Sequence, residues 1–79
     1  MTDEEIKTVL AKIIETVDRL ADETAELVDH YQRTRLAPEY QQEAIDRANA
    51  LTVASRNMRQ AASTLLDIPD RQARQGEAQ

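Results

Sequence analysis

The only histidine of the chain and the acidic residue that precedes it are the first candidates for chemistry. Glu26 and His30 are four residues apart, a spacing that puts both side chains on one face of a helix, where they could share a metal ion. The Glu-x-x-His spacing of di-iron bundles is absent. General-base catalysis needs a positioned partner, and no Ser or Cys nucleophile has a relay near His30. We therefore expect no catalytic residue and no metal site, and we expect His30 either to interact favourably with a helix dipole or to lie at a helix edge.

Three arginines in the second half of the chain have the planar charged group that suits phosphate. They are Arg47, Arg56 and Arg59. A nucleotide site also needs a backbone cradle, and residues 38–67 contain neither a lysine nor a glycine-rich loop. We expect these arginines to be exposed or to pair between helices and we expect no cofactor, with a small ligand on the arginines as an open alternative.

Length, composition and charge restrict the class of protein. A single domain of 79 residues without cysteine has no disulfide to stabilise it, and a core of this size supplies only about 3–5 kcal/mol. The net charge of −5 argues against nucleic-acid binding. Most of the acidity lies in residues 1–30, where Asp18, Asp22 and Glu26 form a stripe that is either solvated or guides a basic partner. With an acidic N-terminus and no apolar run of about 20 residues, we expect a soluble cytoplasmic protein without a membrane span.

A heptad pattern of mainly apolar residues predicts a long helix over residues 3–34. Thr2 and Glu5 fit a capping box at its start. A second apolar row runs beside the first, so the helix has a wider apolar face than one partner helix would cover. The first row consists of Ile6, Leu10, Ile13, Val17, Leu20, Thr24, Leu27 and Tyr31, and the second of Ile14, Ala21 and Val28.

The segment around Pro38 predicts a turn over residues 35–38 and the start of a second helix that runs to about residue 67. We expect its anchors toward the first helix to be Ala44, Leu51, Met58 and Leu65. Pro69 is expected to end this helix, and residues 70–79 are expected to be a disordered polar tail. The prediction is an all-α antiparallel helical hairpin over residues 1–69, packed as part of a coiled-coil-like or four-helix assembly.

Apolar residues outside the main rows indicate an association surface. Ile14, Val28, Val53 and Leu66 would be partly exposed in a lone hairpin. Tyr31 and Tyr40 flank the turn, where they could stack as a hydrophobic cap or serve as a partner hot spot, and both interpretations stay open. The predicted partner-binding residues are Ile14, Val28, Tyr31, Pro38, Tyr40, Leu51, Met58, Leu65 and Leu66.

The turn segment, Leu36-Ala37-Pro38-Glu39-Tyr40-Gln41-Gln42, is followed by Ala48, Leu51 and a helix rich in small residues. In this it resembles the YscE-type proteins, the small cytoplasmic co-chaperones of the type III secretion needle subunit. The resemblance covers most of residues 6–68 as architecture but only residues 38–42 as a motif. It implies binding to a helical-repeat chaperone, with which such proteins keep the needle subunit unpolymerised before export. The motif would fall on Pro38, Tyr40, Gln41 and Gln42, and the apolar faces of both helices would supply the interface.

Two other functions remain as alternatives. Two hairpins could form a homodimeric four-helix bundle that regulates or inhibits another protein, because a two-fold pair would also bury the wide apolar faces. A hairpin oligomer could instead bind nucleotides through the arginines of the second helix. The sequence thus predicts a helical protein-binding module with no catalytic role.

Overall fold

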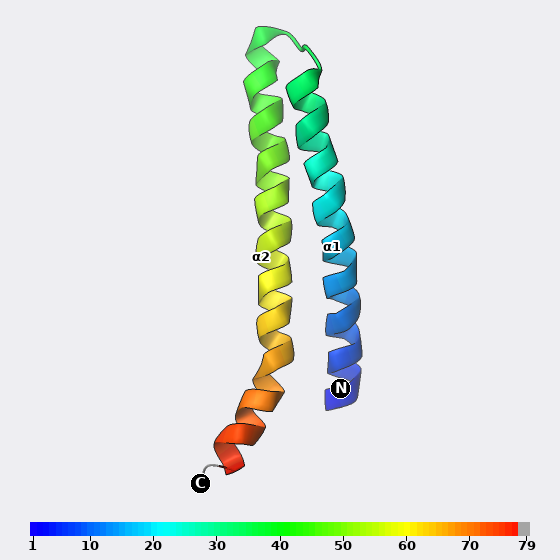
Figure 1. Ribbon diagram of the computed structural model, residues 1–79, viewed down its shortest axis with the longest axis vertical. Coiled ribbons are helices and arrows are strands. Elements are labelled where there is room, and N and C mark those ends of the chain that lie inside the picture. Colours follow the sequence, from blue (N-terminus) through cyan, green and yellow to red (C-terminus); the bar gives the residue numbers. More distant parts are fainter. Residues whose placement is uncertain (78–79) are drawn as a thin grey trace.

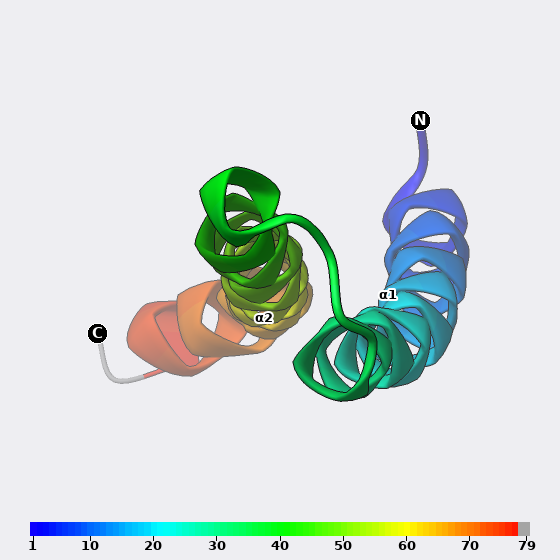
Figure 2. The same ribbon diagram turned by 90° about the horizontal axis from the view of Figure 1, so that it is seen from above.

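Two long antiparallel helices joined by a short turn make up the protein in the computed structural model, which describes residues 1–77 (Figure 1). Helix α1 spans Asp3–Arg33 and helix α2 spans Pro38–Glu77. They lie side by side over the length of α1, and no strand is present in the described part of the chain (Figures 1 and 2). The predicted all-α helical hairpin is therefore confirmed.

Helix α1 begins where the capping pattern predicts. The backbone N–H of Glu5 donates to Oγ1 of Thr2 at 3.2 Å, and the Thr2 hydroxyl donates to Oε1 of Glu5 at 3.2 Å. Acidic residues occupy the first turn, and His30 and Arg33 lie in the last, so both ends complement the helix dipole.

Gln41 fixes the turn between the helices. Its Nε2 donates to the backbone oxygen of Tyr31 at 2.6 Å, and its Oε1 accepts the backbone N–H of Leu36 at 2.7 Å. One side chain from the first turn of α2 thus satisfies backbone groups at the end of α1 and in the turn. Pro38 is the first residue of α2, a position where its missing N–H removes no helical hydrogen bond.

The residues packed between the two helices, which we call the seam, are mostly large on α1, whereas the buried ones on α2 are all small. The small side chains allow the two backbones to approach closely. The buried hydroxyls of Thr24 and Ser55 donate to the backbone oxygens of Ala21 and Thr52, each at 2.9 Å, so neither is left unpaired. The seam is formed by buried Leu10, Val17 and Thr24 with half-buried Ile14, Ala21 and Val28 on α1, and by buried Ala48, Ser55 and Ala62 with half-buried Ile45, Thr52 and Leu66 on α2.

The structure corrects the prediction of which rows pack against each other. The expected anchors Leu51, Met58 and Leu65 are exposed, and so are Ile13, Leu20 and Leu27 of the first heptad row. The second row of α1 lies in the seam instead. When three adjacent rows are apolar, periodicity alone does not say which two face the partner helix. The seam that forms packs α1 against the small residues of α2 and leaves the larger Leu51, Met58 and Leu65 of α2 exposed.

Helix α2 also extends past the predicted end. It continues through Pro69 to Glu77, so the expected end near residue 67 and the disordered tail are wrong for residues 70–77. Residues 78 and 79, also assigned to that tail, lie outside the described residues. A proline removes one helical hydrogen bond and kinks a helix without having to end it. Figure 1 shows the orange and red end of α2 bending away from the hairpin axis, and Arg71 Nε lies 3.1 Å from Asp67 Oδ2 across this bend.

The hairpin is elongated and has a thin core. Its radius of gyration is 18.2 Å, whereas a compact chain of this length would have about 12 Å. In the described part of the chain, the buried apolar side chains are those of Leu10, Val17, Ala48 and Ala62. A single hairpin therefore leaves much apolar surface in contact with solvent.

Candidate protein-binding surface

Six large apolar side chains remain exposed in two rows, one along each helix. Successive members of a row are seven residues apart, so each row follows its helix as a stripe. We call these six residues the apolar face. They are Ile13, Leu20 and Leu27 of α1, and Leu51, Met58 and Leu65 of α2.

The antiparallel packing puts both rows on the same side of the hairpin. Leu20 directly precedes the seam residue Ala21, and Leu51 directly precedes the seam residue Thr52. Viewed from one end of the hairpin, the helical wheel of α2 is the mirror image of the wheel of α1 across the seam, because the two helices run in opposite directions. Residues with the same relation to the seam therefore share a side, and the two rows form one continuous face.

The apolar face widens at its edges. Val9 and Ile68, both exposed, lie next to it, and so do the small residues Ala54 and Ala61. Val9, Ala54 and Ala61 each directly precede a seam residue, as every member of the face except Met58 does. The broad surface that results is apolar along most of both helices.

The opposite side of the hairpin is acidic. Its acidic residues each directly follow a seam residue and are all exposed. Asp18 Oδ1 accepts from Arg59 Nε at 2.6 Å, which links the two helices on this side. We call these acids the acidic face: Glu15, Asp18, Asp22 and Asp29 of α1, with Asp46 and Asp67 of α2.

Six of the nine predicted partner-binding residues lie on the apolar face or in the seam, and the other three lie near the turn. Leu51, Met58 and Leu65 are on the apolar face. The structure places Ile14, Val28 and Leu66 half-buried in the seam, where they expose less surface than expected. Sequence reasoning assigned Ile13, Leu20 and Leu27 to the helix–helix contact and so did not include them among the partner-binding residues. An uninterrupted row of large apolar residues on both helices is the signal that could have identified them.

Near the turn, the two tyrosines are not stacked on each other. Tyr31 is half-buried and its ring lies edge-on to the ring of His30, with centroids 5.2 Å apart and planes at 72°. Tyr40 is exposed beside the apolar face, and Pro38 is exposed at the start of α2. Of the two aromatic rings, Tyr40 is the one available to a partner.

The polar residues do not converge on a chemical site. His30 Nε2 lies 3.4 Å from Oγ1 of Thr34, and residues 1–77 contain no cluster of three or more His, Asp or Glu side chains arranged for a metal. Arg47 precedes a seam residue, Arg56 follows one, and Arg59 pairs with Asp18 between the helices. The three arginines therefore point in different directions instead of forming one phosphate site.

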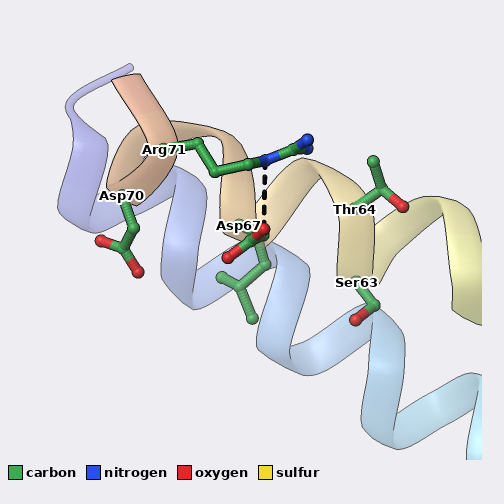
Figure 3. A pocket seen from close by; sticks show the side chains of 6 residues that line it. Ser63, Thr64, Asp67, Asp70 and Arg71 are labelled. Atoms are coloured by element: carbon green, nitrogen blue, oxygen red, sulfur yellow. Dashed lines mark ion pairs between the residues drawn. The ribbon is translucent and has the colours of Figure 1, made fainter. Parts of the chain in front are cut away.

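The concave region near the C-terminal end of α2 is open and polar. Figure 3 shows the ion pair between Arg71 and Asp67 within it, with Asp70, Ser63 and Thr64 around it. Leu66 is the half-buried member of this lining. The arginine is already paired, and an exposed lining of this kind offers little to enclose a small ligand.

Comparison with family models, with curated proteins and with solved structures finds no match to this chain. Over the described residues, neither helix has an apolar stretch that could cross a bilayer.

Proposed function

We propose that this chain is a non-enzymatic protein-binding module that docks its apolar face against helices of another polypeptide chain. The observation that carries the proposal is the continuous exposure of six large apolar side chains on one side of the hairpin. Contiguous apolar patches on soluble proteins mark sites of association. Helix-in-groove and helix-bundle contacts use side chains at this heptad spacing.

The energetics of the hairpin support the same proposal. Fully burying a Leu, Ile or Met side chain contributes about 1.5–3 kcal/mol. The members of the apolar face retain roughly half of their accessible surface, so docking would contribute about 1 kcal/mol for each of them. This would add to what the thin seam supplies through the same kind of burial, and a partner would therefore stabilise the fold.

The resemblance to needle-subunit co-chaperones supplies a specific candidate partner, a helical-repeat chaperone that holds a needle subunit in the cytoplasm. The hairpin architecture and the turn motif support it. Within that motif, Gln41 already has an intrachain role in fixing the turn. Tyr40, next to the apolar face, is the motif residue that a partner could contact.

Co-purification tests the proposal. The tagged chain would be co-expressed with a helical-repeat chaperone of the needle type, alone and with a needle subunit, and as the variants Leu51→Glu and Val53→Glu. Leu51 is 51% exposed on the apolar face and Val53 is 54% exposed on the other side, so the two variants add the same charge at equal exposure. We expect Leu51→Glu to lose the complex and Val53→Glu to retain it. Equal retention by both variants would refute docking through the apolar face, and no complex with the unaltered chain would refute this chaperone as the partner.

A further inference from the structure

We propose that the occupant of the apolar face is a second copy of this chain, packed face to face about a two-fold axis parallel to the long axis of the hairpin. The product is a four-helix bundle with both turns at the same end. This inference rests on the proposed function, because it names the partner of the same face.

The hairpin exposes more surface than a compact monomer would, and the excess matches the area that each copy buries in a dimer. The chain exposes 6332 Å², whereas a compact monomer of 9.0 kDa would expose about 4,850 Å². The excess of about 1,500 Å² lies within the range of roughly 1,000–2,500 Å² that each partner buries in an obligate homodimer. One further hairpin on one face is enough to remove it.

The charges favour a second copy over a partner of opposite charge. Among the residues that directly precede the seam, from Val9 to Leu65, the acidic and basic members are one each, Glu23 and Arg47. A surface with one charge of each sign is complementary to itself. The acidic faces of both copies would point outward, where their like charges oppose the addition of further copies.

The positions of Glu23 and Arg47 along the helix axes, which we call their heights, determine the orientation of the two copies. Glu23 lies ten residues before the last residue of α1, and Arg47 lies nine residues after the first residue of α2. With a rise of about 1.5 Å per residue, they are at nearly the same distance from the turn. A two-fold axis along the hairpin packs α1 on α2 of the second copy, so Glu23 meets Arg47 of that copy, twice in the dimer. A perpendicular axis packs α1 on α1 and leaves both charges without a partner.

The same orientation brings matching residues together along the whole face. Leu20 and Leu51 are each thirteen residues from the turn ends of their helices, and Ile13 and Met58 are each twenty. At the edges, small residues oppose larger ones: Leu27 lies at the height of Ala44, Thr16 close to Ala54, and Val9 close to Ala61. Every pair of neighbouring helices is antiparallel, as in up-down bundles with short loops.

Engineered cysteines test the orientation, because the chain contains no cysteine of its own. Light scattering should first give a mass of twice 9.0 kDa for the unaltered chain. Thr16→Cys chains mixed with Ala54→Cys chains should then form a disulfide-linked dimer on mild oxidation, at least about tenfold faster than either variant alone. Faster linkage of Thr16→Cys to itself would overturn the axis, since it requires α1 to pack on α1.

Charge reversal tests the same contact without a covalent bond. Glu23→Arg and Arg47→Glu should each weaken the dimer roughly tenfold, and the double variant should return to within about threefold of the unaltered chain. The matched control is Asp22→Arg, on the other side of α1, which should not weaken the dimer. Equal weakening by the double variant and the single variants would overturn the proposed pairing.

The two proposals fail in different ways. A folded monomer at all concentrations that binds a helical-repeat chaperone, and loses it with Leu51→Glu, would overturn the second copy and leave the protein-binding function standing. A folded monomer in which Leu51→Glu and Val53→Glu behave alike in every assay would overturn both.

Discussion

The two sides of the hairpin differ in their charged residues. One side consists of the residues that directly precede a seam residue in the sequence, and the other of the residues that directly follow one. The positions that precede a seam residue, from Val9 to Leu65, include one acid and one arginine. The positions that follow one, from Ala11 to Asp67, include six acids and one arginine. Both helices share this asymmetry, and the antiparallel arrangement adds the two halves together. The seam therefore divides the molecule into a side suited to burial and a side suited to water.

The acidic side also explains why association would be limited to one face. Its carboxylates are exposed and close to one another along α1, so a second apolar surface on this side would have to remove them from water. Like charges repel when two such faces approach. We therefore expect a closed assembly instead of a continuing one.

The largest effect should come from placing charges within the apolar face. Leu20→Glu combined with Leu51→Glu puts carboxylates where the partner helices meet, and should abolish assembly and lower the free energy of unfolding by about 3 kcal/mol or more. Light scattering and urea denaturation would measure both effects. The control, Val53→Glu, should change neither, and a folded dimer of the double variant would contradict the assignment of this face.

A smaller loss should follow from enlarging the seam that separates the two sides. Ala48 is buried against α1, and Ala48→Leu should cost about 1–3 kcal/mol because no space is available for the added atoms. Ala50 is exposed on the outer surface of the same helix, so Ala50→Leu should be nearly neutral. Thermal melts of both variants would compare them, and equal melting temperatures would show that the close approach of the helices is not required.

The turn joins the two helices at one end of the hairpin, and its contribution to the free energy of unfolding should be intermediate. Gln41→Ala removes two hydrogen bonds to backbone groups and should destabilise the hairpin by about 1–2 kcal/mol. The bond from Gln42 Nε2 to Asp46 Oδ1 at 2.8 Å is exposed, so Gln42→Ala should cost less than about 0.5 kcal/mol. Urea denaturation of the two variants measures the difference. A larger loss of stability with Gln42→Ala than with Gln41→Ala would show that Gln41 does not fix the turn.

The smallest effect should be a gain in stability when one carboxylate of the acidic face is replaced by a lysine. Asp22 lies four residues from both Asp18 and Glu26, and Asp22→Lys replaces two repulsive i,i+4 pairs with attractive ones worth a few tenths of a kcal/mol each. Added salt should shrink this gain by screening. Glu23→Lys, one residue away on the other side, should instead weaken assembly. If both variants affected assembly alike, the division of α1 into two sides would be wrong.

Much of the fold could be predicted because it depends on local signals. The capping pattern at Thr2, the long heptad and the turn before Pro38 each act within a few residues, and they predict two helices that return on each other. The end of α2 could not be predicted from Pro69, because a kinked helix and an ended helix differ by interactions beyond the proline itself.

The sequence by itself determined the rows: which residues of each helix are apolar, which are small and which are acidic. It did not determine which rows meet, because Ile13 and Ile14 are neighbours and either row of α1 could face α2. Only the tertiary structure decided that the row of Ile14 packs on the small residues of α2 and that the row of Ile13 stays outside. The physical reason is that periodicity fixes directions around one helix, whereas a shared face depends on how two helices are rotated and directed relative to each other.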